Sequence, residues 1–380
     1  MFFIMIFAHP WQYLLKENLN MRYTGYFLLL ILAFNFTHAQ SWTDKPELNF
    51  SGFVDVFYVY DFNKPQTEQR QPFFFNHNRH NEFNLNLGLI QFNLTHPKYR
   101  AVFAMQAGTY ANDNYAAEPG VLKNINEAKI GISLNAKNNL WLDVGIMNSH
   151  LGFESAVSID NPTLTRSFTA ESSPFFLTGA KLTFNPSNNW ELAATVCNGW
   201  QRIERVQGNS LLSFGTQIIF TPSENTTLNW STFIGTDDPD STRRMRYFNN
   251  FYGIFQLSQK VSLIAGFDIG FQQKVKNSST YDSWLTPIII AQYSITEKWK
   301  TAVRIEYYQD ETGIIIPTGT PNGFKTTSAS LNFDYFPTPD LACRIEGRWL
   351  GSEDEIFEKN GTFKNNDFFI ATSIAVRFNK

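Results

Sequence analysis

Charged residues are scarce in this sequence, and cysteine is almost absent. Asp, Glu, Lys and Arg make up 17% of the 380 residues, below the roughly 25% of an average soluble domain. The formal net charge of −3 gives no basic excess, so we expect no nucleic-acid partner. The two cysteines, Cys197 and Cys343, fall about eight expected strands apart. We predict that both are free thiols, since a disulfide needs Cα atoms within about 7 Å.

Enzyme signatures are also missing. The sequence has no P-loop, no G-x-S-x-G, no H-E-x-x-H and no paired C-x-x-C motif. His77 and His80 are spaced i, i+3 but have no third ligand in a suitable spacing, so no metal site is predicted. We therefore expect a protein that is not an enzyme and that needs no cofactor.

Aromatic residues are abundant instead. They make up 16% of the chain, with 37 Phe, while the mean hydropathy is only −0.26. Such a chain fits strands with one apolar and one polar face, as in a transmembrane β-barrel. An aromatic-rich soluble β-sandwich would have a similar composition, so composition alone leaves both open.

The N-terminus resembles an export signal. Arg22 precedes an apolar run from Tyr26 to Phe36, and small Ala39 follows shortly after it. This order is typical of a secretory signal peptide, and the run is too short for a membrane-spanning helix, which needs about 20 residues. We predict cleavage after Ala39, so that residues 1–39 are an N-terminal extension plus signal peptide and residues 40–380 form the mature domain.

From Leu48 onward the hydrophobic pattern has a period of two. In residues 298–309, for example, Val303 and Ile305 alternate with Arg304 and Glu306. Alternation over ~9–11 residues is the signature of barrel strands. The expected strands, about sixteen, are 48–61, 82–95, 99–110, 125–135, 139–149, 174–184, 189–200, 211–221, 226–236, 247–258, 260–272, 282–295, 298–309, 324–336, 340–350 and 367–378.

The connections between these segments alternate between short and long. The short ones are rich in Asn, Pro and Ser, which make tight turns. The long ones are 62–81, 111–124, 150–173, 201–210, 237–246, 273–281, 310–323 and 351–366. Short periplasmic turns and long extracellular loops are the rule for outer-membrane barrels. The sequence therefore predicts an all-β fold, a transmembrane antiparallel β-barrel of about sixteen strands.

Aromatic residues near the strand ends predict girdles at the two membrane interfaces. The candidates are Trp141, Trp190, Trp200, Trp230, Trp284, Trp299, Trp349, Tyr307 and Tyr308. The last segment alternates up to Phe378, as in barrels whose final strand is read by the barrel assembly machinery. Two further residues follow Phe378 here, which departs from that pattern.

Several segments resemble the OmpL-like β-barrel porins of bacteria. They are 51–62 (SGFVDVFYVYDF), 106–119, 149–174, 198–203 and 317–324, and the third is the most specific. The resemblance covers nearly all of the mature chain. It implies an outer-membrane β-barrel that acts as a porin, and it implies no particular substrate.

Charged residues on the expected inner face would line such a pore. They are Asp55, Glu127, Lys129, Asp143, Lys181, Asp268, Arg304, Glu306, Asp334, Arg344, Glu346 and Arg348, together with Arg377. Rings of charge in a lumen can select ions. The same residues could instead brace the inner wall, and the sequence does not separate the two roles.

The longest loop, residues 150–173, carries Glu154, Asp160, Arg166 and Glu171. Loops longer than about 12–15 residues are usually functional or disordered. We predict that this loop folds into the lumen and places these four charges at a constriction. A loop packed on the outer rim is the alternative.

The sequence as a whole predicts an outer-membrane, porin-like channel for passive diffusion of small hydrophilic solutes or ions. A closed or substrate-gated barrel, with a structural, adhesive or enzymatic role, is the alternative. The expected partners are outer-membrane lipids, lipopolysaccharide (near the basic cluster Arg243, Arg244 and Arg246) and the assembly machinery. Analogy with other bacterial porins suggests a homotrimer, but one smooth lipid-facing belt would suit a monomer equally, so the sequence leaves both open.

Overall fold

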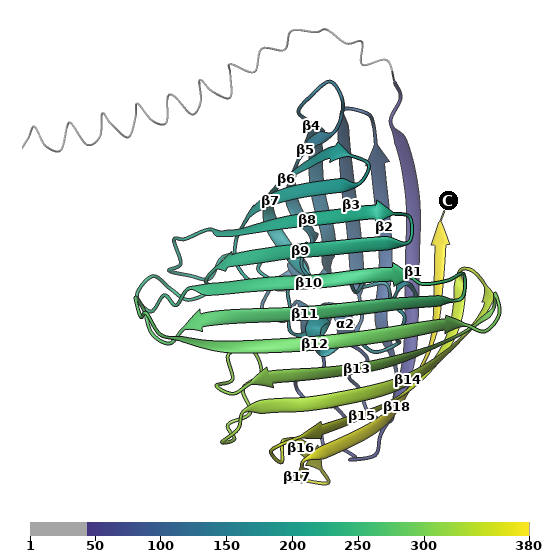
Figure 1. Ribbon diagram of the computed structural model, residues 1–380, viewed down its shortest axis with the longest axis vertical. Helices are drawn as coiled ribbons and strands as arrows, with labels where there is room; N and C mark the ends of the chain where they lie inside the picture. Colours follow the sequence, from purple (N-terminus) through teal and green to yellow (C-terminus); the bar gives the residue numbers. More distant parts are fainter. Residues whose placement is uncertain (1–43, 380) are drawn as a thin grey trace, which may run out of the picture. The chain divides into compact units, whose positions relative to one another are not determined.

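The computed structural model describes residues 44–379, and residues 46–380 make up one compact unit. Sixteen antiparallel strands close into a barrel (Figure 1). The barrel strands are β1 (Glu47–Asp61), β2 (Phe83–Thr95), β3 (Tyr99–Ala107), β4 (Ile125–Ser133), β5 (Leu140–Asn148), β6 (Phe176–Ser187), β7 (Trp190–Cys197), β8 (Ser213–Ser223), β9 (Thr226–Gly235), β10 (Arg246–Gln256), β11 (Val261–Gln273), β12 (Tyr281–Ser294), β13 (Trp299–Asp310), β14 (Phe324–Thr338), β15 (Leu341–Ser352) and β18 (Asn366–Asn379).

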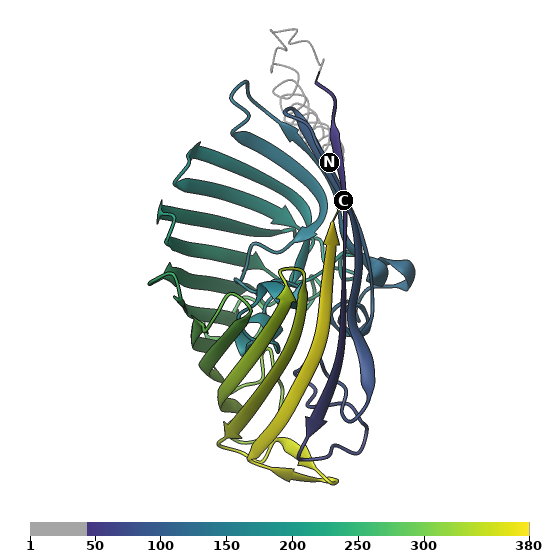
Figure 2. The ribbon, with the colours of Figure 1, turned by 90° about the vertical axis from the view of Figure 1, so that its right-hand side faces the viewer.

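Each strand pairs with its neighbours in sequence, and β1 pairs with β18 to close the barrel. That seam runs from Ser51 opposite Asn379 to Asp61 opposite Phe369, and Figure 2 shows the two strands side by side. A hairpin of β16 (Phe357–Lys359) and β17 (Thr362–Lys364) lies in the connection between β15 and β18. Its three-residue strands are too short to produce a readable alternation, so the sequence pattern missed it.

The strands present an apolar face outward and a polar face inward. On β13, Val303 and Ile305 are 46% and 59% exposed, whereas Arg304 between them is fully buried. On β1, Val54 and Val56 are exposed and Asp55 is buried. An exposed apolar belt of this kind is stable only against lipid. The two-residue period therefore predicted the facing of these strands correctly.

The connections alternate as expected, with short turns at one end of the barrel and long loops at the other. The long loops also hold short helices, α2 (Thr109–Asn114), η1 (Gly120–Asn124), η2 (Ser158–Asp160) and α3 (Phe168–Glu171). No helix within residues 44–379 is long and apolar enough to cross a membrane. The predicted signal peptide and the cleavage after Ala39 lie outside the described residues.

The predicted aromatic girdle is only partly correct. Trp190, Trp230, Trp299 and Trp349 are each more than 40% exposed on the outer face. Trp284 and Tyr308, in contrast, are buried, and Trp200 lies in a loop and packs against Trp284. These three residues sit near strand ends but point inward. The girdle prediction failed for them because it used position along the strand and not the facing of each residue. Both cysteines are free, as predicted.

A lysine on the lipid-facing belt should destabilise the barrel. Ile305 lies in the middle of β13, so Ile305→Lys should lower the free energy of unfolding by about 2–4 kcal/mol. Val275→Lys is the matched control, because Val275 is 64% exposed in the loop after β11 and should cost less than about 0.5 kcal/mol. Urea unfolding in lipid vesicles measures both, and equal losses would contradict the outward facing of Ile305.

Candidate functional site

Three long loops contribute buried side chains to the barrel interior. They connect β1 to β2 (residues 62–82), β3 to β4 (108–124) and β5 to β6 (149–175). The second loop is inside only in part, since Tyr110 and Ala111 of α2 are buried whereas Val121 of η1 is 78% exposed. From the first loop Phe73 and Phe74 are buried, and from the second Tyr115 stacks on Phe176 at 4.1 Å. The candidate site is the interior that these loops share with the wall.

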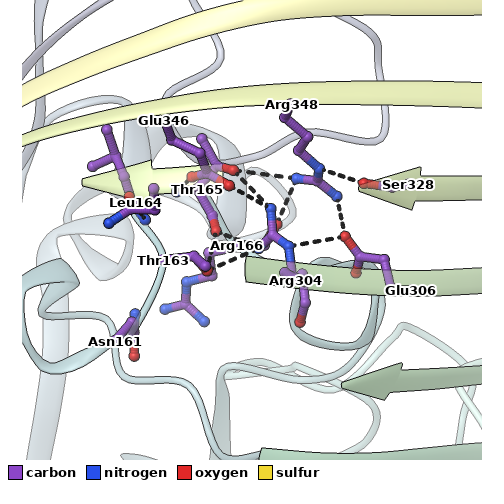
Figure 3. Close-up of polar contacts among 12 residues, drawn as sticks. Asn161, Thr163, Leu164, Thr165, Arg166, Arg304, Glu306, Ser328, Glu346 and Arg348 are labelled. Carbon is purple, nitrogen blue, oxygen red and sulfur yellow. Dashed lines mark hydrogen bonds and ion pairs between the residues drawn. The ribbon is translucent and has the colours of Figure 1, made fainter. Parts of the chain in front are cut away.

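The 149–175 loop, which contains the predicted constriction segment, is anchored on the inner wall of β13 to β15. Arg304 Nη1 donates to the Thr165 carbonyl at 2.6 Å, and its Nη2 donates to Glu346 at 2.8 Å (Figure 3). The other oxygen of Glu346 accepts from the Thr165 backbone N–H at 2.6 Å. Two opposite charges on neighbouring inner-face positions thus hold one loop residue from both sides.

A second pair repeats this arrangement next to the first. Arg348 donates to Glu306 at 2.7 Å and to the Arg166 carbonyl at 2.8 Å. Glu306 in turn accepts from the Phe168 backbone N–H at 2.7 Å. We call Arg304, Glu306, Glu346 and Arg348 the anchor network. All four side chains are fully buried.

The loop then continues along the wall toward the short-turn end. Arg344 is paired with Asp334 at 2.7 Å and also donates to the Asn161 carbonyl at 2.9 Å. Farther along, Asp160 forms an ion pair at 2.9 Å with Arg377, which lies near the end of β18. The loop therefore crosses much of the barrel interior from its long-loop end.

Most of the twelve charged residues predicted to line the pore are buried and paired with other side chains. Ten of the twelve are less than 5% exposed, and only Lys129 and Lys181 are partly accessible. Asp143 pairs with Arg100, and Glu127 pairs with Lys129. Asp268 accepts from Asn250, and Lys181 donates to Gln217. Asp55 accepts from His77, Asn86, Ser158 and Ser373. These contacts brace the wall and the loops in this conformation.

The four charges of the predicted constriction are placed differently from one another. Asp160 is exposed, while Arg166 and Glu171 are buried and Glu154 is half-buried. Glu154 accepts from the Ser167 backbone N–H at 3.0 Å. The guanidinium of Arg166 lies 4.3 Å from the centre of the Phe175 ring, a cation–π contact. Water reaches this set mainly at Asp160.

Glu171 joins two of the inward loops. Its carboxylate accepts from the backbone N–H groups of Phe75 and Asn76 at 3.1 and 3.3 Å, and from the Asn76 side-chain amide at 3.2 Å. Burial raises the pKa of Glu171 to about 7, and the nearby cation Arg166 and these amide donors oppose that rise. This carboxyl therefore changes charge near neutral pH while it holds the 62–82 loop.

Two cavities lie on either side of the segment 170–173. One, of about 290 Å³, is lined by Gln91 of β2, Asn148 of β5 and Tyr252 of β10, as well as by the 149–175 loop. The other, of about 380 Å³, lies among the long loops and is lined by Glu171 and Trp200. Ser173 lines both cavities. The segment 170–173 thus forms a partition between the two cavities.

The period-two pattern did not predict that segments of the 62–82 and 108–124 loops lie inside the barrel. A different signal in the composition of these loops would have indicated it. The run Phe73-Phe74-Phe75 and the tyrosines Tyr110 and Tyr115 are too apolar for loops exposed to water. Within residues 44–379 no cluster of three metal-ligating side chains occurs. His77 contacts Asp55, and His80 accepts from the Asp61 backbone N–H.

Breaking the anchor network should be costly. Arg304→Ala leaves Glu306 and Glu346 with less compensation while they stay buried, so the free energy of unfolding should fall by about 3–5 kcal/mol. Arg244→Ala is the control, since Arg244 pairs with Asp238 in an exposed loop and such pairs contribute less than about 1 kcal/mol. Urea unfolding in lipid vesicles compares them, and an equally small loss for both would show that the network does not hold the loop.

Solved structures of outer-membrane channels share this architecture. The outer membrane channel DcaP of Acinetobacter baumannii has a TM-score of 0.57 at 10% identity, covering 88% of this chain and 97% of that one. An anion-selective porin from Comamonas acidovorans gives 0.60 at 8% identity, covering 88% and 100%. The in-vitro folded trimer form of OmpT, an outer membrane protein of Vibrio cholerae, gives 0.59 at 7%, covering 88% and 100%. At these identities the likeness shows the fold alone.

No curated protein sequence matches the chain. The family model described as "Putative beta-barrel porin-2, OmpL-like" matches residues 47–378, which is the whole barrel from β1 to nearly the end of β18. The closed barrel, its apolar outer belt and its inward loops agree with that match. The chain therefore belongs to the OmpL-like family of β-barrel porins, and it is a porin channel of the outer membrane.

Proposed function

We propose that this porin lets small hydrophilic solutes and ions diffuse passively across the outer membrane, and that the 149–175 loop narrows the passage. The observation that carries the proposal is the path of this loop, from its anchor on β13 and β15 to the ion pair between Asp160 and Arg377. The loop is also held on the other side of the barrel, where the His150 carbonyl accepts from Gln217 of β8 and Ser231 of β9. The space beside the loop includes the 290 Å³ cavity, with Gln91, Asn148 and Tyr252 on its walls.

A substrate-gated barrel is the second candidate. The partition at 170–173 separates the two cavities, and Glu171 ties it to the 62–82 loop. A channel with such a partition conducts freely only when the loops move apart. Both candidates use the same loop, and they differ in how often the passage is open.

The remaining partners follow from the barrel surface. The exposed apolar belt would contact outer-membrane lipid, and the strand that ends near Phe378 would be read by the assembly machinery. The basic cluster Arg243, Arg244 and Arg246 has less free positive charge for lipopolysaccharide phosphates than the sequence suggested. Arg243 and Arg244 are paired with Asp240 and Asp238, and Arg246 lies over the Trp200 ring. We keep the homotrimer as part of the proposal, by analogy with porins.

Conductance in a planar bilayer across a salt gradient tests the proposal directly. Steady open steps are expected for a diffusion pore, and the reversal potential gives the ion preference. Correctly folded protein that stays silent would overturn passive diffusion and favour the gated barrel.

Shortening the inward loop should widen the pore. Deleting residues 155–170 removes the segment that crosses the interior, while the arginines and carboxylates of the anchor network still pair with one another on the wall. The barrel should therefore still fold, and single-channel conductance should rise. The control is deletion of the loop 274–280, which joins β11 to β12 and is not one of the three inward loops. It should leave the conductance unchanged. Unchanged current after the first deletion would rule out the constriction.

Lowering the pH should protonate Glu171 and so favour the packed loops that close the passage. The pKa of this buried carboxyl is about 7 in the packed loops, whereas a carboxyl released to water has a pKa of about 4.3. The packed state therefore binds the proton more tightly, and its advantage is complete below about pH 4.3 and lost as the pH rises to about 7. Conductance should therefore increase as the pH rises from about 4.3 to about 7. Glu171→Gln should remove that increase, and an identical pH profile in both proteins would contradict the assignment to Glu171.

A further inference from the structure

The cavity of about 380 Å³ among the long loops has the composition of a ligand pocket. Its walls are mainly apolar and include Phe73, Phe75, Trp200, Ile315 and Ile316. Pockets for small molecules typically combine such walls with a few polar groups and volumes of roughly 300–1,000 Å³. A surface meant only to pass ions and water has no need of this concentration of apolar side chains.

Each wall of the cavity is fixed by a carboxylate. Asp310 accepts from the backbone N–H groups of Ile315 and Ile316 at 2.7 and 3.0 Å. Asp237 accepts from the Trp200 backbone N–H at 2.8 Å. Glu171 accepts from the Phe75 backbone N–H at 3.1 Å. The loops are therefore held in the shape that forms the cavity, which lowers the entropic cost of binding.

The ring of Trp200 is held in place by neighbouring side chains. It makes edge contacts with Phe233 and Phe248 at centroid distances of 5.0 and 5.1 Å. The Arg246 guanidinium lies 4.9 Å from its ring centre. Trp200 is thus a rigid wall against which a flat ring can pack.

The polar groups of the cavity set the charge of a ligand. Glu171, Ser172, Ser173 and Gln201 supply them, and of the described residues that line the cavity none is Lys or Arg. The cations Arg166, near Glu171, and Arg246, over the Trp200 ring, do not line the cavity. The charge in contact with a ligand is therefore the Glu171 carboxylate, which favours cations over anions. The pocket therefore matches a solute with one apolar ring and a neutral or positively charged polar group.

We propose that this cavity is a binding site for small cyclic, amphipathic solutes that are neutral or cationic, with the ring on Trp200 and Phe75 and the polar group toward Glu171. The inference rests on the proposed pore function, because Ser173 belongs to both this cavity and the inner one. A solute bound here would stand at the outer entrance of the passage and would be the class that the channel takes up first.

Three probes separate ring from charge. 2-Phenylethylammonium has both features, n-butylammonium has the charge without the ring, and 3-phenylpropionate has the ring with the opposite charge. Calorimetric titration of the refolded full-length barrel in detergent should show 2-phenylethylammonium binding at least about tenfold more tightly than the other two. Equal affinities for all three would overturn the proposal.

Two variants and one control locate the site. Trp200→Ala and Phe75→Ala should each weaken 2-phenylethylammonium about tenfold or more. Trp200 also packs in the barrel, so Phe75→Ala, which keeps the backbone N–H that Glu171 accepts, guards against loss of folding. Phe363→Ala, in the exposed hairpin β16–β17 outside this cavity, should bind normally. Unchanged binding in both folded cavity variants would overturn the site.

Conductance recorded on the same protein separates this inference from the pore function. Normal salt currents without 2-phenylethylammonium binding would overturn the site and leave the pore intact. Binding that depends on Trp200 and Phe75 in a barrel that carries no current would support the site and contradict passive diffusion.

Discussion

The interior of this barrel depends on the burial of four paired charges. Arg304, Glu306, Glu346 and Arg348 are removed from water, and burying an ion is costly unless it is paired and its hydrogen bonds are satisfied. Here the pairing is completed by backbone groups of the 149–175 loop, from Thr165 to Phe168. The wall satisfies backbone groups of the loop, and the loop covers charges that already pair with one another on the wall. Each arrangement therefore stabilises the other.

The position of this loop then determines that of its neighbours. Through Glu171 it holds the backbone of the 62–82 loop, and through Phe168 it packs on the same aromatic cluster as Phe73 and Phe324. Phe73 contacts Phe324 at a centroid distance of 4.8 Å. The polar contacts that anchor the loop on β13 and β15 thus position Phe168 for apolar packing among the long loops. The two cavities are the space that remains between these layers.

Period-two alternation was enough to predict the strands, their facing and the closed barrel, because facing is a local property of each strand. The interior was not readable in the same way. Thr165 and Glu346 meet across 181 residues of sequence, and no local pattern indicates which inward charge will be covered by which loop. Tyr308 was misplaced for a different reason: the girdle was predicted from nearness to a strand end alone, although Tyr308 shares a face of β13 with Arg304 and Glu306. Trp284 was misplaced in the same way. Alternation predicts which face a residue is on and says nothing of what covers it.

Asp55 has a consequence for how the molecule is assembled. Its carboxylate sits on β1 and accepts from Ser373 on β18, from Ser158 in the 149–175 loop and from His77 in the 62–82 loop. These donors meet only after the first and last strands have paired. The complete set of contacts therefore cannot form while the nascent barrel is still open at its seam. Closure of the strand ring therefore precedes completion of the interior, because Ser373 reaches Asp55 only when β1 and β18 have paired.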